Sequence, residues 1–223
     1  MSIPVAGQKR LVIVGATGMV GGYALRYALD HPGVGRVTVI GRRKLSLSHP
    51  KLTQVQHLDF ADCSGLLETL SGQDAAIFCL GTYTGSVSDA ELRKITVDYR
   101  IEFARVLHGS SPEAAFSFLS GNGAETGPSR MPFARYKGEG RECTTRGRLP
   151  QRLHISTRVY LPRGAAQGTE LQLPAAARNL SRVSHALPQP GAIVDVVVQE
   201  TGKRASVVLE NHNIRAMAER RLS

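Results

Sequence analysis

Three glycines near the start of the chain, Gly15, Gly18 and Gly21, follow one another at intervals of three residues. They come directly after the apolar run 11–14 and open a stretch with helical spacing. Such a loop can cradle a phosphate. The first glycine permits a tight turn, the second lets the backbone approach a pyrophosphate, and the third lets the helix pack closely. Free N–H groups at the positive end of the helix then face the anion. In this strand–turn–helix context the spacing predicts a dinucleotide-binding loop.

The end of the next predicted strand indicates which dinucleotide the loop would hold. A protein that recognises the ribose 2′-hydroxyl of NAD carries Asp or Glu about 20 residues after the loop. Here the strand 36–40 is followed by Gly41-Arg42-Arg43-Lys44, with three cations and no acid. An arginine can bind a 2′-phosphate through two hydrogen bonds. The pattern favours NADP(H), with NAD(H) as the second possibility, although a solvated basic turn would give the same sequence.

Alternating apolar runs and amphipathic stretches over the first 140 residues predict an α/β fold with a Rossmann-like, doubly wound parallel sheet. We expect strands at 11–14, 36–40, 54–58, 75–80 and 114–119, and helices at 18–30, 64–70, 88–107 and 132–142. The long helix begins with a capping box, Ser88 and Glu91. Its predicted apolar face consists of Leu92, Ile95, Tyr99, Phe103 and Val106.

The periodic pattern ends in residues 141–190, which contain eight arginines, no lysine, five prolines and one aromatic residue, Tyr160. We interpret this C-terminal part as degraded or irregular. One explanation is a shifted reading frame that replaces a substrate lobe and is restored near residue 192. The other is a divergent or disordered insert. The chain would then comprise a dinucleotide-binding domain at 1–140, the irregular segment, and a strand and helix at 191–223 that return to the domain.

Composition and charge narrow the classes of function. A chain of 223 residues with 42% hydrophobic content suits one globular domain. The net charge is +10, but 141–190 carries +6 of it and only 5% of residues are aromatic, so nucleic acid is not an expected partner. No run approaches the roughly 18 apolar residues of a membrane span, and no membrane contact is expected. The oligomeric state stays open.

The cysteines indicate the compartment. Cys63, Cys79 and Cys143 are odd in number and lack metal-ligand spacing. The start of the chain also lacks the apolar run of a secretory signal. We therefore expect no bound metal and a cytoplasmic, reducing environment.

The sequence resembles the atypical short-chain dehydrogenases, and among them the Tat-interacting-protein-like oxidoreductases. The likeness covers about residues 8–140 and 194–220. It rests on the glycine loop, on residues 39–45, and on Phe78-Cys79-Leu80-Gly81-Thr82, Val97-Asp98-Tyr99, Leu119-Ser120 and Lys137-Gly138-Glu139. The family implies a Rossmann-like domain that binds NADP(H) or NAD(H) as its small-molecule partner.

The resemblance also implies cofactor contacts at matching positions. Those of the first turn are Gly15, Thr17, Gly18, Met19, Val20 and Gly21. Arg42 and Arg43 would face the 2′-phosphate, and Asp59 and Phe60 would lie against adenine. Leu80, Gly81 and Thr82 would flank the cofactor at the end of the fourth strand. Asp59 and Thr82 could equally be ordinary cap or turn residues.

The catalytic pattern departs from that of the family. Short-chain dehydrogenases use a tyrosine four residues before a lysine, which lowers the pKa of the phenol for proton exchange with substrate. Lys137 is present, but position 133 is Phe133, and Tyr136 would point about 100° around the helix. The paired serines of the family appear here as Ser120-Gly121. Lys137 and Ser120 are the predicted remainder of the relay, and Lys137 would also hold the nicotinamide ribose.

Two functions follow from these residues. The first is an NAD(P)-dependent oxidoreductase, with an impaired relay, that acts on a carbonyl or alcohol. The alternative is a non-catalytic NADP(H)-binding sensor or scaffold protein, which Phe133 and Gly121 favour.

Overall fold

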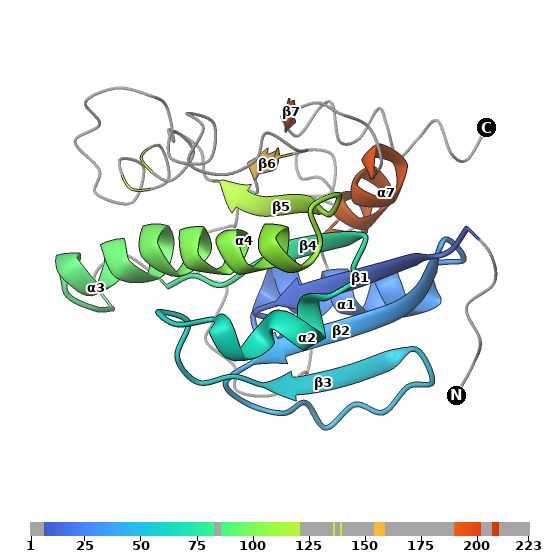
Figure 1. Ribbon diagram of the computed structural model, residues 1–223, viewed down its shortest axis with the longest axis horizontal. Coiled ribbons are helices and arrows are strands. Elements are labelled where there is room, and N and C mark those ends of the chain that lie inside the picture. The colour runs from blue at the N-terminus through green and yellow to red at the C-terminus, as the bar shows by residue number, and fades with distance from the viewer. Residues whose placement is uncertain are drawn as a thin grey trace, which may run out of the picture.

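A computed structural model of the protein describes residues 7–82, 86–120, 136, 139, 154–158, 190–201 and 207–209. Seven strands in this described part form one sheet in the order β3-β2-β1-β4-β5-β6-β7 (Figure 1), and every neighbouring pair is parallel. The order reverses between β1 and β4, which makes the sheet doubly wound and confirms the predicted Rossmann-like class. Ligands of such sheets bind outside the carboxyl ends of the strands at this switch point.

The strands are β1 (Lys9–Val14), β2 (Val34–Gly41), β3 (Leu52–Gln56), β4 (Ala75–Phe78), β5 (Ala115–Ser120), β6 (His154–Arg158) and β7 (Val207–Leu209). The helices are α1 (Met19–Asp30), α2 (Leu67–Leu70), α3 (Asp89–Arg93), α4 (Tyr99–Ser110) and α7 (Pro190–Glu200), with a 3-10 turn η1 (Ser64–Leu66) and a π-helical turn η2 (Lys94–Asp98). No described helix is long and apolar enough to cross a membrane.

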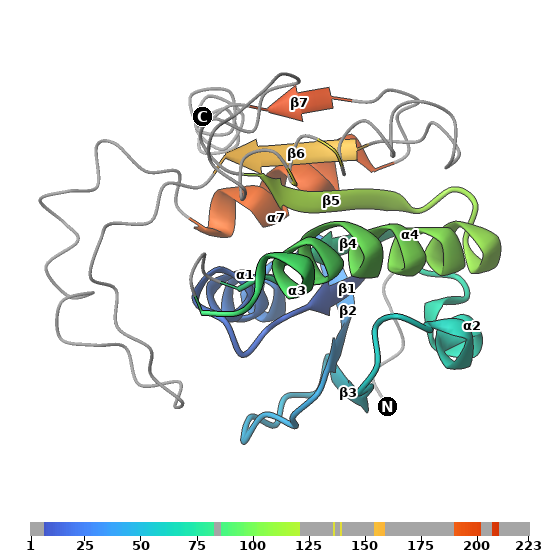
Figure 2. The ribbon, with the colours of Figure 1, turned by 90° about the vertical axis from the view of Figure 1, so that its left-hand side faces the viewer.

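Helices cover both faces of the sheet (Figure 2). Side chains alternate along β1, so Leu11 and Ile13 join the core beneath α1 and α7, whereas Val12 and Val14 join the core beneath α2 and α4. The continuous apolar run of this strand follows from burial on both faces. The second core is rich in phenylalanine; Phe78 and Phe103, for example, have ring centroids 5.5 Å apart.

A buried polar contact joins α7 to the end of α1. Asp195 Oδ2 accepts a hydrogen bond of 2.7 Å from Tyr27, and its Oδ1 lies 3.1 Å from His31 Nε2. His31 Nδ1 accepts the N–H of Gly33 at 2.9 Å, so Nε2 carries the proton that faces the carboxylate. Four apolar residues of α7, Ile193, Val194, Val196 and Val197, lie in the same core as α1. The residues of α7 near 195 therefore cover the same face of the sheet as α1.

The predicted long helix is present but interrupted by the π-helical turn η2. Ser88 Oγ accepts the N–H of Glu91 at 3.3 Å, which confirms the serine half of the predicted capping box. The wider turn rotates the helix, so Thr96 is buried and the predicted face residue Ile95 is only partly buried. The prediction of one continuous apolar face is therefore wrong at this turn, because it assumed 3.6 residues per turn throughout.

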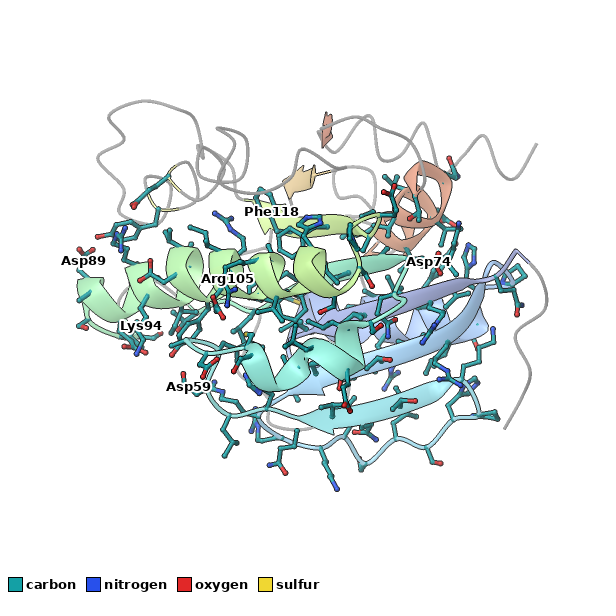
Figure 3. The ribbon with its side chains drawn as sticks, viewed as in Figure 1. Asp59, Asp74, Asp89, Lys94, Arg105 and Phe118 are labelled. Carbon is teal, nitrogen blue, oxygen red and sulfur yellow. The ribbon has the colours of Figure 1, made fainter. Side chains whose placement is uncertain are left out.

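The same rotation brings a charged residue inside. Arg100 is 2% exposed, and its guanidinium carbon lies 4.3 Å from the ring centroid of Phe118, a β5 residue labelled in Figure 3. A cation over an aromatic face is favourable, most of all where water is excluded.

The C-terminal part differs from expectation at one described place. Residues 154–158 form β6, which pairs with β5 on one side and β7 on the other. The expectation of an irregular segment is therefore wrong for these five residues. The remainder of 141–189 lies outside the described residues, as do residues 210–223 and most of 132–142. The frameshift interpretation stays a hypothesis.

Candidate functional site

The turn between β1 and α1 is built from glycines that have no room for a side chain. Gly15 has φ +83°, and a Cβ there would lie 2.9 Å from the backbone of Cys79 and Leu80. A Cβ on Gly21 would lie 2.4 Å from the carbonyl oxygen of Gly15. The N–H of Gly18 donates to the same oxygen at 3.0 Å. Helix, turn and the end of β4 are thus in direct backbone contact.

The first turn of α1 directs backbone donors to this edge of the sheet. Gly22 donates the first helical hydrogen bond, 2.8 Å to Gly18 O, so the N–H groups of residues 19–21 precede the helical ladder. Within the described chain no side chain caps this helix, and its first turn holds no acid. Thr17 and Gly18 are exposed, and Met19 is 39% exposed. An anion placed here would accept these donors and be stabilised by the helix dipole.

Val20 and Gly21, also predicted to contact the cofactor, are buried. Val20 is 8% exposed and packs in the core beneath α1. Because the Val20 side chain lies in the core and Gly21 has none, these two positions can contact a ligand only through their backbone N–H groups.

The end of β2 lies beside the glycine turn, because Val14 of β1 is in register with Ile40 of β2. Arg42, Arg43 and Lys44 follow the strand and are exposed. Their positive charges lie at the same edge of the sheet as the open end of α1. A phosphate on the ribose of a dinucleotide held in the glycine turn would meet these cations.

The predicted adenine contacts, Asp59 and Phe60, differ from each other in exposure. Asp59 is exposed toward the carboxyl edge (Figure 3), and its Oδ1 accepts the N–H of Ala61 at 2.9 Å, which makes it a turn residue. Phe60 is 1% exposed, and its ring meets that of His57 edge-on at 5.1 Å. A ring buried in this way offers no face to an adenine, so the position can present only its backbone.

The turn after β3 is tied to α4 by Glu102. This carboxylate accepts the N–H of Cys63 at 3.3 Å and two hydrogen bonds of 2.8 Å from Arg105. The hydrogen bonds from Arg105 lower the pKa of Glu102. Hydrogen bonds from Ser64 lower the pKa of Asp62 in the same turn. Burial raises the pKa of the Cys63 thiol to about 12.

The remaining predicted residues follow β4 and β5. Leu80 and Thr82 are partly buried and Gly81 is exposed just beyond β4. Ser120 is the last residue of β5, and its backbone is in register with Arg158 of β6. Lys137 and position 133 lie outside the described residues. The structure therefore gathers the glycine turn, the basic segment, the β4 end and Ser120 at one edge, and the role of Lys137 stays a prediction.

Sequence reasoning missed two contacts on either side of Lys137. Tyr136 is 5% exposed, and its hydroxyl donates to Asp89 at the start of α3. Arg93 donates to the carboxylate of Glu139. The hydroxyl of Tyr136 is thus engaged with Asp89. Partners more than 40 residues apart leave no local signal in the sequence.

The described residues contain no group of three His, Cys, Asp or Glu side chains placed to hold a metal ion. The glycine turn, in contrast, meets the requirements of a pyrophosphate-binding turn: Gly15 and Gly21 allow backbone packing that a Cβ would prevent, and Gly18 leaves the start of α1 free of a side chain. Fold and turn together define a Rossmann-fold protein with a glycine turn at the switch point of its sheet.

Comparisons with known proteins narrow this class. No protein-family model matches the chain. It is 31% identical over 134 residues to the mitochondrial protein fmp52-1 of Aspergillus terreus, covering 58% of this chain and 57% of that protein. It is 28% identical over 133 residues to HTATIP2 of Rattus norvegicus, covering 59% of this chain and 54% of that protein. The chain thus spans little more than half the length of these relatives.

Solved structures agree on the fold. A short-chain dehydrogenase from Leptospira borgpetersenii with bound NAD+ superposes with a TM-score of 0.62 at 12% identity, over 93% of both chains. The chain is thus a distant homologue of fmp52-1 and HTATIP2 over part of its length, and it shares the fold of short-chain dehydrogenases. The predicted resemblance is confirmed.

Proposed function

We propose that the protein binds NADP(H) at the carboxyl edge of its sheet and is an oxidoreductase acting on a carbonyl or alcohol group. The observation that supports the cofactor site most directly is the glycine turn. A Cβ at Gly21 would lie 2.4 Å from Gly15 O, while the first turn of α1 keeps its N–H groups open. The protein would do this in the cytosol, in keeping with its cysteine usage.

Each part of the site has its own task. The N–H groups of residues 19–21 would hold the pyrophosphate, and Arg42 and Arg43 would hold the 2′-phosphate. A bound nicotinamide supplies or accepts a hydride. Ser120 and Lys137 would orient the substrate oxygen and the ribose. Because Phe133 has no hydroxyl, it cannot exchange the proton that the tyrosine of the family exchanges.

A second candidate function is cofactor binding without turnover, as in a redox sensor or scaffold. The sequence favours it at two positions, Phe133 and Gly121, where the family carries hydroxyl groups. The relatives and structural neighbours do not decide between the two, because their likeness concerns the fold and part of the chain.

The first test is a fluorescence titration of the chain with NADPH and NADH. We expect NADPH to bind at least about tenfold more tightly, since each arginine–phosphate contact is a charge-assisted hydrogen bond. Arg42→Ala should remove most of this difference and leave NADH affinity unchanged. Arg26→Ala, which removes an exposed arginine of α1, is the matched control. Failure of the wild-type chain to bind either nucleotide would contradict the proposal.

The second test separates the two functions. NADPH oxidation is followed with a panel of quinones and aldehydes. Turnover supports the enzyme, whereas binding without turnover supports the sensor. In the latter case Phe133→Tyr should restore activity if Lys137 stands where the family places it, because the helix would then carry both the tyrosine and the lysine of the family's proton relay.

A further inference from the structure

The connection between β2 and β3, residues 42–51, contains no helix and runs back along the edge strand of the described sheet (Figure 1). Such a segment has no backbone ladder of its own to order it. One side chain of β3 takes over this task. Gln54 Oε1 accepts the N–H of Leu45 at 2.8 Å, and its Nε2 donates to Leu45 O at 3.2 Å and Leu47 O at 2.9 Å. Both ends of one amide are therefore committed to the loop.

A second glutamine acts at the other end of the basic segment. Gln56 Nε2 donates to the carbonyl oxygen of Arg42 at 3.0 Å, and His57 N–H donates to Gly41 O at 3.0 Å. Gln54 and Gln56 share a face of β3, because alternate residues of a strand point the same way. Their contacts at Arg42 and Leu45 bracket the cationic residues.

Apolar packing fixes the far side of the same loop. Leu45 is 8% exposed and lies in the core beneath α1, and Leu47 packs against that core. Arg42, Arg43 and Lys44 stay exposed on the held backbone. The backbone of the loop is thus held in place without a ligand, although the side chains of its three cationic residues face solvent.

We propose that Gln54 and Gln56 are positioning residues that set the preference for a 2′-phosphorylated dinucleotide. The inference rests on the proposed function of the site. When a loop must become ordered on binding, the conformational entropy that it loses weakens the net free energy of binding. The two glutamines remove this cost by holding the backbone of 42–47. They touch no ligand atom themselves and act through Arg42 and Arg43.

The test compares adenosine 2′,5′-bisphosphate with 5′-AMP, which differ only in the 2′-phosphate. Gln54→Met keeps the length of the side chain and loses its three hydrogen bonds. We expect it to weaken binding of the bisphosphate about tenfold and to leave binding of 5′-AMP within about twofold. Gln56→Met, which loses one exposed bond and should keep the fold, is expected to weaken the bisphosphate about threefold. Calorimetry at one ionic strength measures both, because salt screens phosphate contacts.

Gln73→Met is the matched control. Gln73 is also held by its amide, which donates to Thr69 O at 2.8 Å, but it precedes β4 at the opposite edge of the sheet. The Gln73→Met variant should unfold at a lower temperature, but the ratio of its affinities for the bisphosphate and for 5′-AMP should stay unchanged. A structural defect alone would lower both affinities in step.

The outcomes are distinct. A selective loss for the bisphosphate in the β3 variants supports the inference. An equal loss for both nucleotides, or no loss at all, overturns it and leaves the proposed function intact. If the wild-type chain binds 5′-AMP but shows no gain from the 2′-phosphate, the NADP(H) assignment fails, and the inference fails with it.

Discussion

Two neighbouring connections at the carboxyl edge of the sheet are built on opposite principles. The turn from β1 into α1 consists of main chain, and at Gly15 and Gly21 even a methyl group would strike the backbone of a neighbour. The connection from β2 to β3 is held by side chains, with Gln54 and Leu45 as its main contacts. The first can recognise a feature common to all dinucleotides, and the second can distinguish one dinucleotide from another.

The difference teaches which part of the site can vary. The backbone cradle tolerates no side chain at Gly15 or Gly21, because a Cβ there would collide with the backbone of a neighbouring segment. A loop held by amide hydrogen bonds can keep its shape while its exposed cations are replaced. Binding and selectivity should therefore be separable by mutation. Of the four predictions below, those at Gly21 and Gly41 test this separation, and those at the cysteines and at Glu102 test the packing around the site.

The largest effect is expected for Gly21→Ala. The new Cβ would lie 2.4 Å from Gly15 O, so helix and turn must move apart. We expect affinity for NADPH and NADH to fall together by more than about a hundredfold, and the free energy of unfolding to fall by about 1–3 kcal/mol. Nucleotide titration and chemical denaturation measure the two losses.

Gly109→Ala is the matched control. Gly109 lies in α4, and nothing lies within 4 Å of the position that its Cβ would take. Alanine there should stabilise the protein by about 0.5–1 kcal/mol and leave binding unchanged. Retained cofactor affinity in Gly21→Ala would show that the backbone cradle is not needed.

The second prediction concerns two thiols near this edge of the sheet, Cys79 beside the glycine turn and Cys63 in the turn after β3. Burial raises the pKa of Cys63 from 9.0 to about 12, so its thiolate fraction at pH 8 should be about a thousandfold below that of an unperturbed thiol. Cys79, beside the glycine turn, is only partly buried. Alkylation with iodoacetamide, located by mass spectrometry, should modify Cys79 and spare Cys63. The reverse order would contradict the described packing.

The raised pKa of Cys63 also determines how the stability of the protein changes with pH. Because the folded protein keeps the Cys63 proton up to about pH 12, its contribution to stability is full below pH 9 and is lost as the pH rises from there. Cys63→Ala should flatten this alkaline loss in a pH series of thermal unfolding curves.

The third prediction reverses selectivity and leaves the cradle untouched. A Cβ on Gly41 would have Arg43 O as its nearest neighbour, at 3.9 Å, so a side chain fits. Gly41→Asp places a carboxylate at the end of β2, where it can accept the ribose 2′-hydroxyl and repel a phosphate. We expect NADPH affinity to fall about thirtyfold and NADH affinity to hold or rise, since like charges in contact cost several kcal/mol.

Gly65→Asp introduces the same charge on the other face of the sheet, where nothing lies within 4 Å of the new Cβ. It should leave both affinities as they are. A parallel loss of NADPH and NADH binding in Gly41→Asp would show that binding and selectivity are not separable.

The smallest effect is expected at Glu102, which supports the turn after β3. Its pKa in the folded protein is lowered by Arg105, so its stabilising contribution is present above the unfolded value of 4.5 and is lost as the pH falls through the lowered folded value. Glu102→Gln should cost about 0.5 kcal/mol at pH 7, because Arg105 is largely exposed, and nothing once the carboxylate is protonated. Thermal unfolding across this pH range measures the difference.

The predictability of each element followed its burial. β1, β4 and β5 were recognisable because strands covered on both faces are apolar throughout. β3 was predicted two residues too late, since it is a polar edge strand and the apolar residue that suggested its end, Leu58, is 69% exposed. β6, with the sequence HISTR, carries no such run, and its place is defined by its pairing with β5 and β7.

The residues of the candidate site also differ in how well the sequence predicts their contacts. The glycine turn was predictable because only glycine satisfies its contacts, so the constraint is written in the residue type. The contacts of Gln54, and those of Tyr136 with Asp89, are satisfied by ordinary polar residues. Tyr136 and Asp89 are 47 residues apart, and no local pattern connects them.

The contact between α7 and α1 has a consequence for how the chain is made. His31 and Asp195 are 164 residues apart, so the partner of His31 leaves the ribosome long after α1 itself. At roughly 5–20 residues per second this delay is on the order of ten to thirty seconds. Throughout it, the face of α1 that later packs against Ile193 and Val194 has no cover from α7. The nascent protein therefore exposes an apolar surface that chaperones can bind. A premature stop before α7 would leave this surface exposed permanently.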